Sequence, residues 1–191
     1  MGVNFSRALK EDETAELSAA TGFSARQIVR LYSRYSTLDK ENKGYLSRED
    51  FEHIPELAIN PLGDRIIAAF MDGSQDEHVN FKQFLSVLAR FRPIKKHVTN
   101  QSSVNSKEEK LRFAFNMYDL DRDGKISAHE LTEVLKMMVG SNVSPEQLQS
   151  IASLTMKEVD FDQDGTISFD DFQQAMKGIK IEEKMSIRFL S

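Results

Sequence analysis

The stretch Asp119–Glu130, with the sequence DLDRDGKISAHE, decides the fold of this chain. Carboxylates stand at positions 1, 3 and 5, as Asp119, Asp121 and Asp123, a glycine stands at position 6, and Glu130 closes the stretch at position 12. Alternate residues of a tight loop converge on one point, and a glutamate at the end can offer both carboxylate oxygens. An acidic surface turn is the alternative, but it would not require so many coincident positions. The spacing therefore predicts a helix–loop–helix calcium site.

The remaining loop positions agree with this interpretation. Gly124 permits the positive φ of the sharp turn, Lys125 can offer its backbone carbonyl at position 7, and Ser127 can act directly or through a water at position 9. Apolar residues recur at helical spacing on both sides of the loop. The spacing predicts helices that enter and leave the loop.

A second loop of the same kind is DFDQDGTISFDD, residues 160–171. Asp160, Asp162 and Asp164 are in register, but Asp171 stands at position 12, where a glutamate is usual. Aspartate is one methylene shorter and reaches the ion less easily with both oxygens. We expect a divalent cation here, with weaker calcium binding and more tolerance of magnesium than in the first loop.

The first half of the chain holds two loops that have lost ligands. Loop 39–50 has Lys43 at position 5 and the shorter Asp50 at position 12, and an ammonium group competes with the ion. Loop 72–83 has Glu77 in the glycine position and Gln83 at position 12, and its entering helix suggests a one-residue insertion. We interpret both loops as structural.

The four loops group in pairs, which predicts an all-α protein of four helix–loop–helix units in two lobes. Position 8 is apolar in each loop, so short β-links should join the paired loops. The predicted segments are an N-terminal segment with a short helix (1–22), an N-terminal pair (23–92), a polar linker (93–107) and a C-terminal pair with its tail (108–191).

Composition excludes several functional classes. The 191 residues carry a net charge of −5, which argues against nucleic-acid binding, and there is no cysteine for thiol chemistry. No catalytic constellation and no phosphate-binding glycine loop is present, so we do not expect an enzyme.

Without a secretory signal or a membrane span, the expected location is the cytosol. Eight methionines and thirteen phenylalanines suit a groove for an amphipathic helix, although most such residues form core.

The opening residues, MGVNFS, match the short consensus for N-myristoylation at Gly2. An unmodified terminus is the alternative. A single myristoyl chain binds membranes only marginally, so stable attachment would need a second contact.

Several segments resemble a known family. Lys110–Gly140 is similar to the corresponding part of calcineurin B and its relatives in the EF-hand class. Three further segments resemble the calcineurin B homologous proteins more than calcineurin B itself; they are Gly22–Asp39, Ile54–Ile67 and Lys184–Leu190. The same holds for the two lapsed loops, 39–50 and 72–83, which have lost calcium ligands.

This resemblance implies an N-myristoylated regulatory protein that binds the juxtamembrane helix of a plasma-membrane Na+/H+ exchanger in a hydrophobic groove. Binding would support the activity and surface stability of the exchanger. The family is also implicated in inhibiting calcineurin and in membrane traffic. Family site residues match Gly2, Asp119, Asp121, Asp123, Lys125 and Glu130 in the third loop, and Asp160, Asp162, Asp164 and Thr166 in the fourth, where the family usually has glutamate in place of Asp171.

The implied location is the cytoplasm, at the plasma membrane and endomembranes, with nuclear shuttling through segments near 134–143 and 175–183. Buried helix faces explain the apolar spacing of these two segments equally well. Two other functions remain open. One is the regulatory subunit of a serine/threonine phosphatase, with the calcineurin catalytic subunit as partner, and the other is a calcium buffer without partners.

Overall fold

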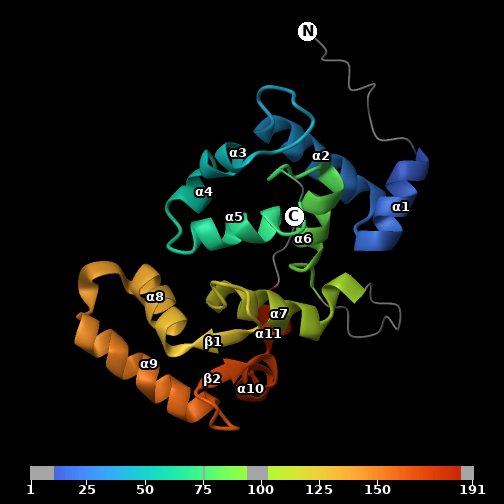
Figure 1. Ribbon diagram of the computed structural model, residues 1–191. Coiled ribbons are helices and arrows are strands. Elements are labelled where there is room, and N and C mark those ends of the chain that lie inside the picture. Colours follow the sequence, from blue (N-terminus) through green and yellow to red (C-terminus); the bar gives the residue numbers. More distant parts are fainter. Residues whose placement is uncertain (1–10, 75, 94–102, 186–191) are drawn as a thin grey trace.

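The computed structural model describes residues 11–74, 76–93 and 103–185, and over these residues the chain is predominantly helical, as predicted (Figure 1). Gly2, most of the predicted linker (residues 94–102) and the end of the tail (residues 186–191) lie outside the described residues. The elements are α1 (Glu11–Thr21), α2 (Ala25–Leu38), α3 (Arg48–Glu52), α4 (Pro55–Ala58), α5 (Gly63–Met71), α6 (Phe81–Ala89), η1 (Ser103–Asn105), α7 (Lys107–Tyr118), β1 (Lys125–Ser127), α8 (Ala128–Val139), η2 (Gly140–Asn142), α9 (Pro145–Val159), β2 (Thr166–Ser168), α10 (Phe169–Ala175) and α11 (Ile181–Lys184).

Local capping signals set the helix starts. Ser24 and Gln27 form a reciprocal capping box at the start of α2. Ser144 and Gln147 do the same for α9, whose first residue is Pro145, and this helix ends at Val159. Both boxes follow the pattern of a serine with a glutamine three residues later, which is visible in the sequence.

Short β-links join the loops in pairs, as predicted. β1 pairs antiparallel with β2, with Ile126 opposite Ile167. In the N-terminal half, Leu46 and Val79 form an isolated bridge in which each N–H donates to the other's carbonyl at 2.9 Å. All four residues are buried at position 8 of their loops. In Figure 1 the two strands run side by side beneath α7.

The one-residue insertion predicted in loop 72–83 stays a prediction. Helix α5 continues to Met71, one residue beyond the expected end, and Asp72 is its C-cap, as Asp119 is for α7. The exit helix α6 begins after Asn80 at position 9. The helix ends are compatible with Asp72 as position 1, but the residues with positive φ in this loop, Gly73, Asp76 and Glu77, differ from those at positions 4 and 6 of the other three loops. Glu77 itself adopts the positive φ, 55°, that the glycine position requires.

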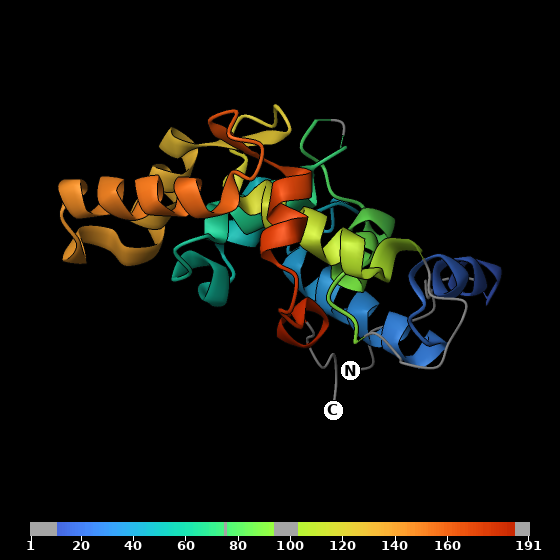
Figure 2. The same cartoon turned by 90° about the horizontal axis from the view of Figure 1, so that it is seen from below.

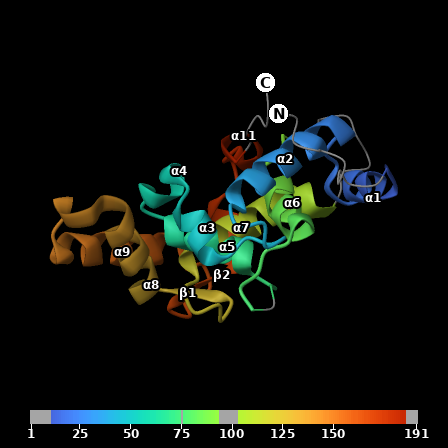
Figure 3. The ribbon, with the colours of Figure 1, turned by 90° about the horizontal axis from the view of Figure 1, so that it is seen from above.

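Two hydrophobic cores share helix α7. Phe113 and Met117 pack in the core of the N-terminal half, whereas Leu111 and Phe115 pack in the core of the C-terminal half. Each pair is spaced i, i+4, so one helix presents two apolar faces. Figure 2 places α7 centrally in an elongated molecule, and Figure 3 places α9 and α1 towards opposite ends.

The predicted linker 93–107 is ordered where it is described. Residues Ser103–Asn105 form η1, Asn105 is buried, and α7 begins at Lys107 after its cap Ser106. Across the described ranges, no helix is both long and apolar enough to cross a membrane.

Candidate metal centres

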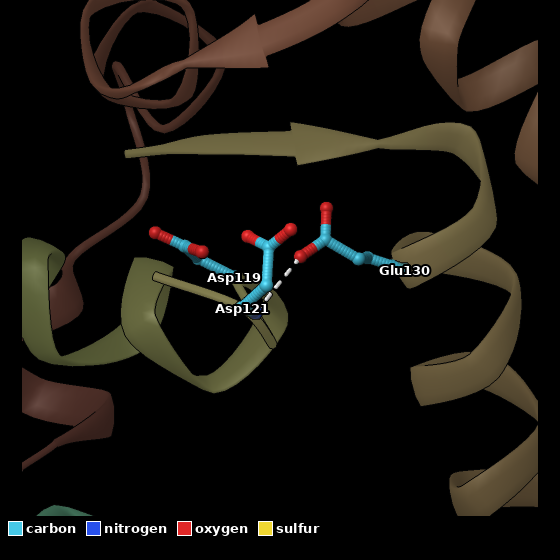
Figure 4. A group of neighbouring side chains, drawn as sticks. All are labelled: Asp119, Asp121 and Glu130. Atoms are coloured by element: carbon cyan, nitrogen blue, oxygen red, sulfur yellow. Dashed lines mark hydrogen bonds between the residues drawn. The ribbon is translucent and has the colours of Figure 1, made fainter. Parts of the chain in front are cut away.

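Loop 119–130 brings three carboxylates together (Figure 4). Asp119 and Asp121 come from the loop after α7, and Glu130 comes from the first turn of α8. Each offers an oxygen, and these oxygens all lie within 4.8 Å of one another. The turn depends on Gly124, which has a φ of 87°, a conformation that side-chain-bearing residues rarely adopt. The geometry can hold a hard divalent cation.

One buried carboxylate oxygen indicates a site for such an ion. Asp119 is 3 % exposed, and its Oδ2 accepts the N–H of Gly124 at 3.1 Å, but its buried Oδ1 has no hydrogen-bond partner in the described structure. Burial raises the pKa of Asp119, and the nearby Glu130 and Asp123 add to this, because a desolvated anion beside other anions is disfavoured. A bound calcium ion would satisfy both the charge and Oδ1, so these residues fit the metal.

Glu130 is held in place by the loop that it closes. Its Oε1 accepts the N–H of Leu120 at 2.8 Å, and its Oε2 accepts the N–H and hydroxyl of Ser127 at 2.8 and 2.7 Å. Burial alone would raise the pKa of Glu130, but these hydrogen bonds outweigh it and lower the pKa. The ligand is therefore ionised and oriented.

Loop 160–171 gathers a different set. Oxygens of Asp160, Asp162 and Asp164 lie within 4.8 Å of one another, and Asp171 is not part of this group. Asp171 Oδ1 accepts the N–H of Phe161 at 3.2 Å, and its Oδ2 accepts the N–H of Ser168 at 2.9 Å. Asp171 thus makes the same backbone contacts as Glu130, while its shorter side chain keeps it outside the acidic group.

Three other predicted site residues are placed around these groups. Asp123 is not in the first group, and its Oδ1 accepts the N–H of Lys125 at 2.8 Å. The Lys125 ammonium crosses to the second loop and pairs with Asp164 Oδ2 at 2.8 Å. Thr166 donates its hydroxyl to Asp164 Oδ1 at 2.6 Å. The predicted ligand roles of Asp123, Lys125 and Thr166 stay predictions.

In the two N-terminal loops, side chains at the ligand positions make an ion pair or a cap contact. In loop 39–50 the Lys43 ammonium lies 2.9 Å from Asp50 Oδ2. In loop 72–83 the side chain of Gln83 accepts the N–H of Asn80 at 2.9 Å, which is a cap contact. Among the described residues, neither loop gathers three acidic side chains in the manner of loops 119–130 and 160–171.

Sequence reasoning missed the contacts that join the two halves at the first site. Arg65 of α5 donates to the carbonyl oxygens of Asn116 and Asp119, both at 2.6 Å. Arg122, at loop position 4, pairs with Asp72 at 2.6 Å. No local pattern signals such long-range pairs. The capping boxes at Ser127 and Ser168 were also missed, although a serine followed three residues later by an acid is visible in sequence.

Comparison with known proteins agrees with this geometry. The family model for an EF-hand domain pair matches residues 108–177, which contain both acidic loops. Calcineurin B of Naegleria gruberi is 44 % identical over 188 residues, 98 % of this chain and 99 % of that protein. In Dictyostelium discoideum, calcineurin B type 2 is 40 % identical over 99 % of this chain and 98 % of its own length, and type 1 is 40 % identical over 95 % of each.

The EF-hand match and the acidic loops establish calcium binding as the chemistry of this chain. The number of ions and the tolerance of the second loop for magnesium stay predictions. The narrower resemblance to the calcineurin B homologous proteins also stays a prediction, since the relatives above carry the name calcineurin B. On identity of 40–44 % over nearly its whole length, the chain belongs to the calcineurin B family of EF-hand proteins.

Proposed function

We propose that this protein is a calcium-loaded regulatory subunit that binds one amphipathic helix of a larger partner. We further propose that this helix lies in the juxtamembrane cytoplasmic region of a plasma-membrane Na+/H+ exchanger. By covering the helix, the protein would support the activity and surface stability of the exchanger.

The observation that carries the helix-binding role is an exposed apolar surface on the hairpin of α8 and α9. Among the described residues eight large apolar side chains are exposed, and five of them lie in this hairpin or directly after it. Such clustering on one element is typical of a protein-binding surface rather than of scattered surface residues. The five are Met137, Met138, Ile151, Leu154 and Phe161.

The helical spacing shows which side of each helix carries this surface. Leu131, Val134 and Met138 fall on one side of α8, but the first two are buried and Met138 is 47 % exposed. The core-facing stripe therefore continues past the core. On α9, Ile151 borders the stripe of the buried Leu148 in the same way. An amphipathic helix would cover such a surface, and methionines adapt to its shape.

The exchanger is favoured as partner by the residues that resemble the calcineurin B homologous proteins, including the lapsed loops 39–50 and 72–83. The calcineurin catalytic subunit is the second candidate, with this protein as its regulatory subunit or inhibitor. It is supported by the full-length similarity to proteins named calcineurin B. We propose the same apolar surface for either candidate.

Calorimetric titration with two synthetic peptides separates the candidates. One peptide carries an exchanger juxtamembrane helix and the other the helix of calcineurin that binds its regulatory subunit, each tested with calcium at millimolar magnesium and again with EDTA. We expect tight, calcium-dependent binding of the exchanger peptide, weakened at least about tenfold by Met138→Glu. Val29→Glu, the same change at another exposed apolar residue on α2, is the matched control.

Preference for the calcineurin peptide would reverse the ranking of partners. Binding of neither peptide would leave a calcium-binding protein without the proposed helix and would refute the proposed function.

For membrane attachment we propose N-myristoylation at Gly2, supported by the MGVNFS opening. The exchanger would supply the second contact that one acyl chain needs. With both contacts, the protein would lie at the cytoplasmic face of the plasma membrane. Fractionation of exchanger-containing cells should then find Gly2→Ala only partly released, and complete release would contradict the second contact.

A further inference from the structure

The side chain of Lys43 folds back into its own loop, 39–50. Its ammonium lies 2.9 Å from Asp50 Oδ2, 3.2 Å from the hydroxyl of Ser47 and 3.8 Å from Glu41 Oε2. These three partners stand at loop positions 12, 9 and 3. In a calcium-filled loop of this class the same positions contribute ligands. A positive charge of the chain itself therefore lies among the groups that would otherwise surround an ion.

The rest of the loop is hydrogen-bonded as if it were complete. Asp39 is buried, and its two carboxylate oxygens accept the N–H groups of Lys43 at 2.8 Å and Gly44 at 2.7 Å. At the equivalent position of loop 119–130, Asp119 keeps one buried oxygen without a hydrogen-bond partner. Asp160 of loop 160–171 accepts two N–H groups in the same way as Asp39, so the feature that sets loop 39–50 apart is the ammonium of Lys43.

We propose that the Lys43 ammonium is the resident cation of loop 39–50, doing for this loop what calcium does for loop 119–130. The N-terminal half would then keep the arrangement of a filled lobe at every calcium concentration. Calcium would be kept out by the charge already present rather than by a missing loop shape.

Charge and burial support a lasting contact. Asp39, Glu41 and Asp50 would repel one another around an empty centre, and one ammonium offsets part of that repulsion. The side chains of Lys43 and Asp50 are 21 % and 12 % exposed, so water and salt screen this pair less than a surface pair. The hydrogen bond to Asp50 raises the pKa of Lys43, which keeps the ammonium charged.

The contact also connects the parts that an ion would connect. Asp50 is in the first turn of α3, so the ammonium fixes the exit helix to the loop. The hydroxyl of Tyr35, on the entering helix α2, shares its one hydrogen between the carbonyls of Gly44 at 3.1 Å and Val79 at 2.9 Å. Val79 belongs to the paired loop. Loop 39–50, whose exit end the ammonium fixes, is therefore also connected to its entering helix and to loop 72–83.

Amide hydrogen exchange on the full chain tests the structural part of the proposal. In EDTA, Lys43→Met should speed exchange of the Leu46 and Val79 amides at least about tenfold, and adding calcium should not restore protection. Lys40→Met is the matched control, since Lys40 lies exposed in the same loop, and it should leave exchange unchanged. Unchanged exchange in Lys43→Met would overturn the proposal.

A second variant tests the identity of the site independently of stability. Lys43→Asp places carboxylates at positions 1, 3, 5 and 12 of loop 39–50. This variant should bind one calcium ion more per chain than the natural protein, by native mass spectrometry and calorimetry. Calcium should also restore the protection of Leu46 and Val79 that is lost in EDTA. An unchanged number of bound ions in folded Lys43→Asp would show that Lys43 does not stand in a cation's place.

Discussion

At the scale of single residues, position 12 separates the two acidic loops. Glu130 lies within the carboxylate group of its loop, whereas Asp171 makes similar backbone contacts and stays outside its group. Both side chains also complete a capping box with the serine at position 9. The helix start is therefore satisfied by either acid, and only the contact with the ion depends on the extra methylene.

We predict that exchanging the two acids reverses the ranking of the loops. Glu130→Asp should weaken calcium binding at loop 119–130 about tenfold, or ~1.4 kcal/mol, because a shorter acid loses bidentate contact. Asp171→Glu should strengthen loop 160–171 by a similar factor and reduce competition by magnesium. Calcium titrations at zero and millimolar magnesium measure both effects, and an unchanged order of affinities would contradict this role of side-chain length.

At the scale of elements, much of the fold follows from local sequence. The capping box at Ser24 involves residues close in sequence. The apolar residues at position 8 are also recognised locally, and the structure confirms the β-links that they predict. The end of α5 at Met71 was missed, because no feature of the sequence marks whether a helix continues for one more residue before a loop. Lys43 was identified as a competitor for the ion, but its contacts with Ser47 and Asp50 depend on the folded loop.

The pair of strands adds a link between loops that the sequence did not reveal. The backbone of Lys125 faces Ser168 across the two strands, and its ammonium extends to Asp164 of the other loop. The hydrogen bond from Lys125, with help from Thr166, lowers the pKa of Asp164 to about 2. Asp164 is therefore ionised at neutral pH, but its ammonium partner competes with an incoming cation.

We predict that Lys125→Met raises the calcium affinity of loop 160–171 about threefold, an effect small enough for an exposed ion pair. Lys157→Met, which removes the same charge near that loop, is the control for general electrostatics. Calorimetric titration at low and high salt measures the change. An equal gain in both variants would mean that net charge matters and the contact does not.

At the scale of the whole molecule, the N-terminal half supports the calcium site of the C-terminal half. Helix α7 belongs to both cores, and Arg65 of α5 binds carbonyl oxygens at the point where α7 ends and loop 119–130 begins. Asp72, at the end of α5, pairs with Arg122 within that loop. Two lapsed loops therefore remain useful, because their lobe positions the loop that binds calcium.

We predict that Arg65→Lys lowers the calcium affinity of loop 119–130 about threefold to tenfold and leaves loop 160–171 unchanged. Lysine keeps the positive charge, but a single ammonium cannot reproduce the planar fork whose Nη2 donates to the carbonyls of Asn116 and Asp119 while its Nε donates to that of Met117. The result therefore isolates positioning from charge. Arg65→Met removes both, and it should also destabilise the fold by about 1–3 kcal/mol in urea unfolding, because carbonyl groups at the end of α7 lose charged hydrogen bonds. If calcium binding is unchanged in Arg65→Lys and rises in Arg65→Met, the arginine acts only through its charge, and the two halves are joined without being coupled.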